Sequence, residues 1–230
     1  MNQLETKKFI YNSLESNDLD TVVSFIQKNK KALSLLIRMA YDKETLVGWR
    51  AIKAVGRVAK GLVKTHNEFL RITARKLLWS LSDESGGIGW AAPELLGEIV
   101  SSDPEGFADI IPLIVEVYDI EEQIFRPGVV YALARVAEVS PDLVANYQNV
   151  IIRSLMDENP QIKIYALDLV GLVWSIACRK NLWSKEYQTK INGVVNNMRN
   201  DNGVAWIYKN NAFIETVVGE KSILMTKILK

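Results

Sequence analysis

The chain has 230 residues, 48% of them apolar and 24% charged, so it can bury a continuous core and we do not expect a disordered chain. Lysine and arginine number 28 and the acids 27, which excludes a global positive field that would draw the protein onto nucleic acid or an acidic membrane. The single cysteine, Cys178, excludes an internal disulfide, and no uninterrupted run of roughly 18 apolar residues occurs, so we expect a soluble cytoplasmic protein without membrane contact.

The chain is expected to begin with two short helices, Asn2 to Glu15 and Leu19 to Asn29. The first carries acids among its apolar residues, which favours an amphipathic helix over a signal peptide. Both precede a repeated pattern, so we expect them to supply the capping pair that a stacked helical array needs at its end.

The middle of the chain contains an internal repeat. Small residues stand late in four helical-looking segments, Gly56, Gly97, Ala134 and Gly171, at successive separations of 41, 37 and 37 residues. Apolar positions around them recur with helical spacing and without the period of two that a strand would show. Because small residues let helices approach closely, this spacing is typical of HEAT-type helix pairs.

Periodicity and helix-ending residues predict four helix pairs. The predicted first helices are 31–41, 68–82, 105–118 and 141–156, and the predicted second helices are 44–60, 88–101, 122–139 and 160–178. Asn159 before Pro160 is a typical helix start, since asparagine caps and the missing proline N–H is not needed there. For Pro93, Pro112 and Pro127 we expect a place in a first turn or a local kink.

The last thirty residues depart from the repeat. Two β-favouring runs flank Lys209, Asn210 and Asn211, and asparagine tolerates the positive φ of a tight hairpin turn. A helix is predicted from 218 to 229, covering the open end of the last pair. We therefore expect a helical repeat region, 1–200, and a hairpin with a capping helix, 201–230, within one domain.

The repeated segments resemble HEAT-like repeats of the type also found in phycobilin lyases. In "DENPQIKIYALDLVG", Asp157, Pro160 and Lys163 match that family's linker aspartate, helix-starting proline and basic residue. The stretch "RITARKLLWSLSDESGGIGWAAPELLGEIV" is similar to a family of bacterial and archaeal HEAT-like proteins for which no activity can be carried over. The resemblance implies an all-α, right-handed α-α superhelix, the HEAT-like solenoid, and no particular reaction.

The linker from Asp83 to Trp90 contains three glycines. Its N–H groups, at the start of a helix, could hold an anion or a partner's carboxylate. The alternative, which we favour, is a helix C-cap and sharp turn that lets Trp79 and Trp90 pack between repeats, Trp90 being the repeat equivalent of Trp49. The candidate binding residues here are Arg75, Trp79, Glu84, Ser85, Gly86, Gly87, Gly89 and Trp90.

Alignment of the repeats places polar residues in two rows on the second helices, which line the concave side of a HEAT-like array. The rows are Lys53, Glu94, Tyr131 and Asp168, and Arg57, Glu98, Arg135 and Leu172. They form either a mixed polar groove for a peptide, RNA or small acidic ligand, or a ladder in which Arg57 and Arg135 flank Glu98. The alternating sign of charge favours the ladder. The candidate binding residues here are Lys53, Arg57, Glu94, Glu98, Tyr131 and Arg135.

The sequence contains no strong catalytic or metal-binding motif. Glu94 and Glu98 are one helical turn apart and could in principle share a metal or act as acid and base, but no histidine accompanies them. His66, the single histidine, lies in a polar linker and is expected to be exposed. We therefore predict no catalytic residue, no metal site and no cofactor.

Three functional hypotheses follow. The leading one is a non-catalytic binding or adaptor protein whose concave face binds another protein or a peptide. The second is a DNA-binding or DNA-repair protein, since some alkylpurine DNA glycosylases are short HEAT-like solenoids; the near-neutral charge argues against phosphate binding. Its basic residues would be Arg50, Lys53, Arg57, Arg75, Arg126 and Arg135. The third is a lyase-like chaperone for a chromophore, which requires an apolar pocket.

Overall fold

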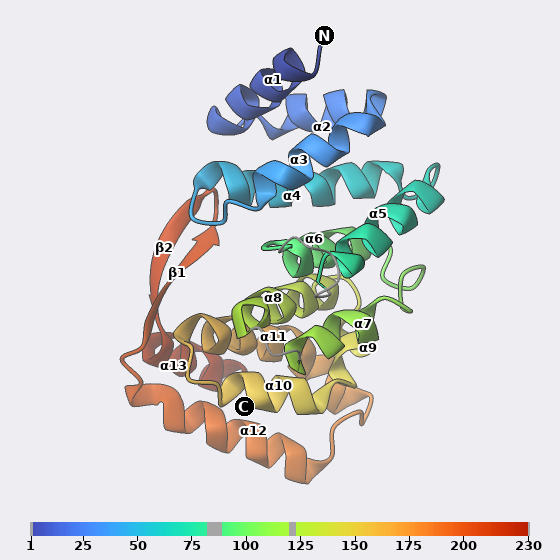
Figure 1. Cartoon of the computed structure of the whole chain (residues 1–230). Helices are drawn as coiled ribbons and strands as arrows, with labels where there is room; N and C mark the ends of the chain where they lie inside the picture. The colour runs from blue at the N-terminus through green and yellow to red at the C-terminus, as the bar shows by residue number, and fades with distance from the viewer. Residues whose placement is uncertain (1, 82–88, 120–122, 230) are drawn as a thin grey trace. The chain divides into compact units, whose positions relative to one another are not determined.

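The computed structural model describes residues 2–81, 89–119 and 123–229 (Figure 1). The chain divides into two compact units, each built mainly of helices. Unit 1 comprises Met1–Ile114 and Asn210–Ala212, and unit 2 comprises Val115–Lys209 and Phe213–Lys230. The all-α fold class with a C-terminal hairpin, predicted from the periodicity, is confirmed.

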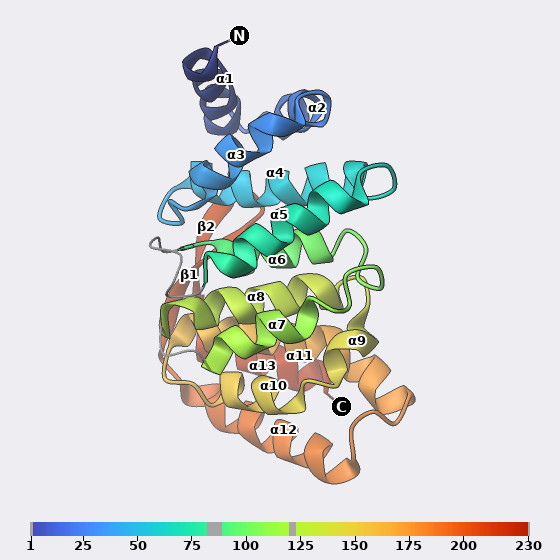
Figure 2. The same ribbon diagram turned by 45° about the vertical axis from the view of Figure 1, so that its right-hand side comes forward.

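Unit 1 consists of three successive helix pairs (Figure 2). They are α1 (Gln3–Glu15) with α2 (Leu19–Lys28), α3 (Leu33–Ala40) after the 3₁₀ turn η1 (Lys30–Ala32) with α4 (Leu46–Leu62), and α5 (Asn67–Trp79) with α6 (Ala92–Val100). Each helix packs against its pair mate, and the second helices also stack, α2 on α4 and α4 on α6. This is the packing of a HEAT-like array, in which one helix of every pair contacts its counterparts.

In unit 1, the helices α1, α2 and α4 each start at a residue whose side chain accepts from a free backbone N–H group. Asn2 caps α1 in a capping box with Glu5, and Thr45 caps α4 by accepting from the N–H of Gly48. Helix α4 buries an apolar stripe that includes Trp49 and Ile52, which holds it between its neighbours. Local capping and the helical period therefore act together to define these elements.

Unit 2 is built around α11 (Pro160–Arg179), which packs against α8, α9, α10, α13 and β1. The other elements are η3 (Val117–Asp119), η4 (Gln123–Phe125), α8 (Arg126–Ala137), α9 (Pro141–Ala145), α10 (Gln148–Leu155), α12 (Lys185–Asn197), η5 (Met198–Asn200), β1 (Val204–Lys209), β2 (Ala212–Val217) and α13 (Val218–Ile228). By length and composition α11 could cross a membrane, but half of it is buried against these elements, as in a core helix. The boundary between the two units falls within α7 (Ile111–Glu116).

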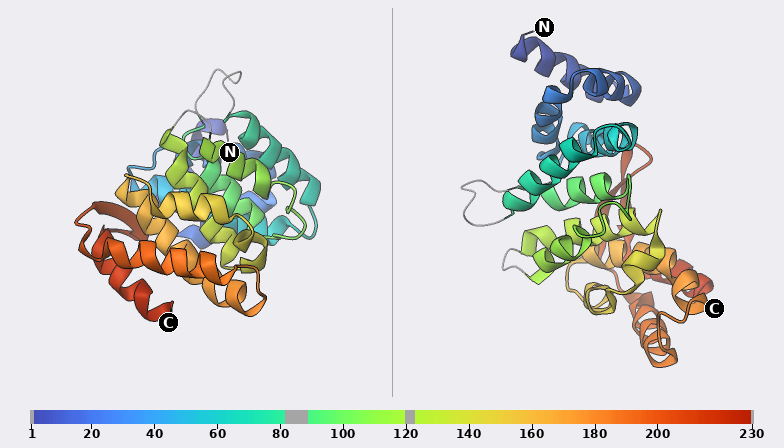
Figure 3. Two further views of the ribbon diagram at one scale, coloured as in Figure 1. Left: turned by 90° about the horizontal axis from the view of Figure 1, so that it is seen from below. Right: turned by 90° about the vertical axis from the view of Figure 1, so that its right-hand side faces the viewer.

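Along the chain, the C-terminal hairpin lies between α12 and α13, two helices that pack as a final pair. Helix α13 packs on α11 and α12, and α12 packs on α10, as expected for the second and first helices of a further repeat (Figure 3). The hairpin turn places Asn210 at φ 52° and Asn211 at φ 63°, so the predicted tight turn with asparagine at positive φ is confirmed. The predicted capping helix thus takes the place of a second helix.

Some predicted helix boundaries were wrong, and proline explains the largest error. The helix expected from 105 begins at Ile111, because Pro112 lacks an N–H and is tolerated only in a first turn. Pro93 and Pro127 also occupy first turns, as expected. The helix predicted at 141–156 is split into α9 and α10.

Polar contacts within each unit join residues about one repeat apart. The pairs are Arg57–Asp20 and Arg71–Asp109 in unit 1, and Tyr118–Asp157, Lys163–Asp201 and Trp183–Ala145 in unit 2, separated by 37, 38, 39, 38 and 38 residues. These separations match the spacing of the small residues along the sequence. The repeat is therefore a period of tertiary contacts as well as of composition.

Candidate functional site

Two carboxylates predicted to line a polar surface are instead buried inside unit 1. Glu94 is 3% exposed and Glu98 is 2% exposed, both on α6. Lys43 donates to Oε1 of Glu94 at 2.8 Å, and Lys53 on α4 donates to Oε1 of Glu98 at 2.8 Å. The lysines are 22% and 29% exposed, so their stems cover the carboxylates while the ammonium groups neutralise them.

The small residue of the first repeat unit makes room for one of these carboxylates. A β-carbon added to Gly56 of α4 would lie 2.1 Å from Oε2 of Glu98, closer than any real contact allows. In unit 2 the equivalent Gly171 faces Met225 of α13, where a β-carbon would lie 2.8 Å from the methyl carbon. Both glycines therefore lie where one second helix crosses the next, which confirms the predicted role at Gly56 and Gly171.

The buried pairs favour the ladder over an exposed groove, with a different partner for Arg57 from the one predicted. Glu98 pairs with Lys53, whereas Arg57 pairs with Asp20 of α2. The predicted flanking of Glu98 by Arg57 was wrong because Arg57, 47% exposed, points to the preceding pair rather than the next one.

Two further candidates, Tyr131 and Arg135, lie on α8 in unit 2. Tyr131 is 7% exposed and packs edge-on against Tyr165, with ring centroids 5.7 Å apart. Arg135 forms an ion pair with Glu138, the C-cap residue of the same helix. The aromatic ring of Tyr131 is thus packed against α11.

The glycine-rich linker is described only at its end. Glu84, Ser85, Gly86 and Gly87 lie outside the described residues. The N–H of Gly89 donates to the carbonyl of Ser80 at 3.2 Å, and a β-carbon on Gly89 would lie 2.4 Å from Ser80 Oγ. At Gly89 the N–H is thus used by the end of α5, which supports the structural alternative for this residue.

The tryptophans beside that linker do not pack as predicted. Trp79 is 59% exposed and Trp90 is 40% exposed, whereas the repeat equivalent Trp49 is 4% exposed. The shared packing role expected for Trp49 and Trp90 was therefore wrong. The two tryptophans are equivalent in the repeat alignment but not in their local structure. Trp90 lies in the turn before α6, whereas Trp49 lies within α4.

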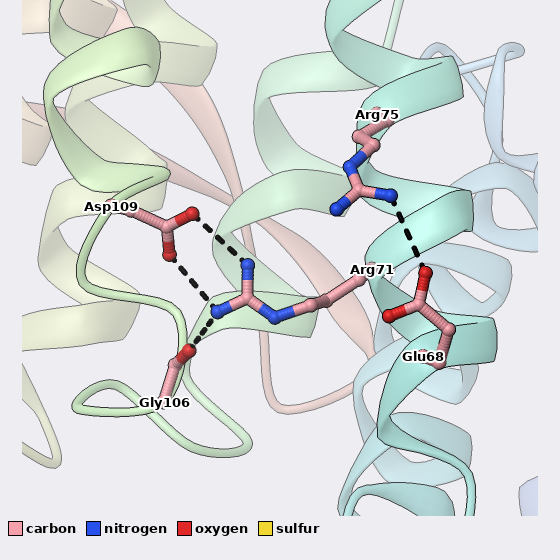
Figure 4. Close-up of polar contacts among 5 residues, drawn as sticks. All are labelled: Glu68, Arg71, Arg75, Gly106 and Asp109. Carbon is pink, nitrogen blue, oxygen red and sulfur yellow. Dashed lines mark hydrogen bonds and ion pairs between the residues drawn. The ribbon is translucent and has the colours of Figure 1, made fainter.

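Arg75 pairs locally on the outer surface of α5 (Figure 4). It reaches Glu68 of the same helix at 3.4 Å, and both side chains are largely exposed. The neighbouring Arg71 donates to both carboxylate oxygens of Asp109, at 3.0 and 3.1 Å, and to the Gly106 carbonyl. These hydrogen bonds join α5 to the segment before α7. The hydrogen bond from Arg71 also lowers the pKa of Asp109, because it favours the charged carboxylate.

His66 is partly buried and hydrogen-bonded, contrary to the prediction of an exposed side chain. Its Nε2 lies 3.0 Å from Nζ of Lys30, and its Nδ1 lies 2.8 Å from Oγ1 of Thr65. The linker that carries it packs one repeat away from η1, which the sequence alone does not show. Among the described residues no group of three or more histidine, cysteine or acidic side chains is placed to hold a metal.

The sequence analysis missed a groove between α1 and α3. It has a volume of about 800 Å³ and is lined by Leu4, Lys7 and Tyr11 of α1, Leu35, Arg38 and Met39 of α3, and the loop that leads to α4. A second hollow of about 690 Å³ adjoins it and shares Gln3 and Leu35. We call the first hollow the α1–α3 groove and the second the η1 hollow.

The groove opens beside the N-terminal end of α1, whereas the C-terminal end of this helix is buried and hydrogen-bonded. Ile10 and Leu14 are fully buried, and Arg50 of α4 donates to the carbonyls of Leu14 and Glu15 at 3.0 and 2.8 Å. At the other end Leu4 remains 62% exposed. A sequence signal was present, since Leu4 and Tyr11 widen the apolar stripe of α1 beyond the buried pair.

Comparisons with known proteins give the following findings. No family model matches the chain. A protein of Archaeoglobus fulgidus described as uncharacterized is 33% identical over 113 residues, which make up 49% of this chain and 58% of that protein. The crystal structure of the archaeal HEAT-like repeats protein from Thermococcus onnurineus NA1 aligns with 97% of this chain and 96% of that chain, at 16% identity and a TM-score of 0.42.

Proposed function

We propose that this HEAT-like helical scaffold is a non-catalytic binding protein that takes another protein or a peptide into its α1–α3 groove. The observation that carries the proposal is the groove itself, about 800 Å³ in volume, with Leu4 62% and Tyr11 43% exposed at its edge. Exposed apolar side chains that border a hollow with polar groups are characteristic of interaction surfaces. In this proposal the groove binds its partner non-covalently and catalyses no reaction.

The sequence predicted binding on the second helices of unit 1, but the acidic side chains there are buried, which favours the α1–α3 groove as the binding site. Glu94 and Glu98 are sealed and neutralised by lysines of the same unit, so binding there would first have to break an ion pair. The α1–α3 groove requires no such rearrangement. Binding is therefore proposed at the groove rather than on the predicted rows.

The pairing of basic residues argues against the DNA hypothesis. Arg50 is held by two backbone carbonyls, and the other five residues assigned to phosphate contact each have a carboxylate partner in this chain. These pairs are Lys53–Glu98, Arg57–Asp20, Arg75–Glu68, Arg126–Asp157 and Arg135–Glu138. A phosphate would have to displace these groups, which weakens the counterion release that drives DNA binding.

For the chromophore hypothesis, the charged lining residues Lys7, Arg38 and Asp42 are a poor match to an apolar pocket.

A peptide-display selection tests the proposed function. Peptides of about 16 residues, long enough to fill a groove between helices, would be selected on the wild-type chain and then measured on Leu4→Glu. We expect selected peptides to lose at least about tenfold in affinity, or roughly 1.4 kcal/mol, on Leu4→Glu. Val139→Glu is the matched control, since Val139 is 58% exposed and lies outside the groove.

Two outcomes would reject the proposal. One is a selection that yields no peptide binding more tightly than about 1 mM, the level of weak non-specific contact. The other is a set of peptides whose affinity falls equally on Leu4→Glu and Val139→Glu, because binding would then take place elsewhere.

A further inference from the structure

We infer that the partner of the α1–α3 groove is an acidic amphipathic helix, an inference that rests on the function proposed above. Local charge is the first support. Among the described residues that line the groove and the adjoining η1 hollow, five are basic and one, Asp42, is acidic. The basic residues are Lys7, Lys28, Lys30, Lys31 and Arg38. The whole chain has a net charge of only +1, so this excess is a local property of the surface.

Most of this positive charge is available to a partner. Lys30 is held by His66, with 3.0 Å between the nitrogens. Lys7, Lys28, Lys31 and Arg38 are exposed, and no ion pair joins them to other residues in the described part of the chain. Four exposed cations beside an apolar groove favour a partner that presents carboxylates around apolar anchors.

The spacing of the apolar side chains matches a helix. Leu4 and Tyr11 are separated by two helical turns of α1, which corresponds to about 10 Å along the axis. Leu35 and Met39 lie one turn apart on the facing helix α3. A ligand helix with apolar residues at i, i+4 and i+7 presents anchors over the same length.

The backbone of the groove also favours a helical ligand. Its two long walls are the helices α1 and α3, whose N–H and C=O groups are largely used in their own hydrogen bonds, so these walls offer no strand edge to an extended peptide. A helical ligand satisfies its own backbone and needs only side-chain contacts. An extended peptide would leave its polar groups unpaired against Leu4 and Leu35.

A second copy of the chain is a weaker occupant on grounds of charge. Helix α13 exposes Ile223, Leu224 and Ile228, which are 44%, 60% and 56% exposed. Its charged residues are Glu220, Lys221 and Lys227, and Lys221 already pairs with Asp168 of α11. Helix α13 therefore presents no excess of carboxylates to Lys7 and Arg38.

The test uses synthetic fluorescent helical peptides on the full chain. The acidic peptide has leucines at i, i+4, i+7 and i+11 with glutamates between them, the basic peptide has lysines in place of the glutamates, and the third carries a central proline. We expect the acidic peptide to bind at least about tenfold more tightly than the basic one, less so as salt rises. We expect the proline peptide to lose most of its affinity.

Charge reversal in the protein makes the test independent of folding defects. The variant Lys7→Glu/Arg38→Glu should bind the acidic peptide at least about tenfold more weakly than the wild type and the basic peptide more tightly. Misfolding cannot produce an increase in affinity. The matched control, Lys60→Glu/Lys64→Glu, changes two exposed lysines of the same unit outside the groove and should leave binding unchanged.

Several results would overturn the inference. They are equal affinity for acidic and basic peptides, full affinity of the proline peptide, or binding that survives Lys7→Glu/Arg38→Glu. Binding of phosphatidylserine-containing vesicles or duplex DNA through Lys7 and Arg38, with no peptide bound, would also overturn it. If the display selection yields peptides that depend on Leu4 but are neither acidic nor helical, the proposed function stands and this inference alone fails.

Discussion

Lys163, in the first turn of α11, forms an ion pair of 2.7 Å with Asp201, which follows η5 and lies 38 residues further along the chain. An equivalent contact, one repeat earlier, joins Arg126 of α8 to Asp157 at 3.7 Å. In both, a basic residue at the start of a second helix reaches the acidic residue of the following linker. Sequence resemblance gave Asp157 and Lys163 as family positions, and the structure shows that each pairs with the neighbouring repeat rather than with the other.

Breaking this contact should destabilise unit 2. Lys163→Met is expected to lower the free energy of unfolding by about 1 kcal/mol, because both side chains are only partly exposed. Urea unfolding followed by circular dichroism measures the change. Lys190→Met, at an exposed lysine of α12, is the control and should change stability by less than about 0.5 kcal/mol. Equal effects of the two substitutions would contradict the assigned role.

The same pair predicts a dependence on pH. The hydrogen bond from Lys163 lowers the pKa of Asp201 below its usual value. A carboxyl whose pKa is lowered on folding stabilises the protein above its unfolded pKa of about 3.9, and this stability is lost as pH falls through the folded pKa. The difference between wild type and Lys163→Met should therefore be full at neutral pH and shrink below about pH 4. A difference that stays constant down to acid unfolding would contradict this.

Gly56 should be intolerant of a side chain. Gly56→Ala is expected to cost about 1–3 kcal/mol, because the new β-carbon meets the carboxylate of Glu98, which Lys53 holds in place. Gly193→Ala is the control, since nothing lies within 4 Å of a β-carbon there, and it should stabilise α12 by about 0.5–1 kcal/mol. Thermal unfolding of both variants gives the comparison. A neutral Gly56→Ala would show that the helices are not in close approach.

The buried pair of Lys43 and Glu94 should behave as a coupled unit. Lys43→Met leaves the Glu94 carboxylate buried without this partner, at an expected cost of about 3 kcal/mol. The double variant Lys43→Met/Glu94→Leu should recover much of that loss, since an apolar pair often replaces a buried ion pair without penalty. A double-mutant cycle measures the coupling. Strict additivity of the two single changes would exclude the assigned interaction.

The hairpin turn should accept glycine and resist branched residues. Asn210→Gly is expected to leave stability within about 0.5 kcal/mol, because glycine adopts the observed φ of 52° without strain. Asn210→Val should cost about 1–2 kcal/mol, since a β-branched residue is strained at positive φ. Calorimetry of the two variants distinguishes them. Equal melting temperatures would mean that the turn does not hold this conformation in solution.

Much of the fold was predictable because its determinants are local. The helical period, the Asn159 cap and the asparagine turn act within a few residues, so the sequence identified these elements. The predicted start at 105 was wrong because Pro112 tolerates no preceding helical turn, so α7 begins at Ile111. The site was harder to predict, since burial of Glu94 and Glu98 and exposure of Trp90 depend on neighbouring repeats.

The sequence by itself determined the repeat, the helical class and the C-terminal hairpin, because apolar spacing, caps and turn residues encode them over short stretches of chain. Tertiary structure alone decided which partner each charge takes and where a hollow remains. Glu98 pairs with Lys53 and not with Arg57, and a groove remains between α1 and α3. Both outcomes depend on how the helices cross and on how far side chains reach between repeats.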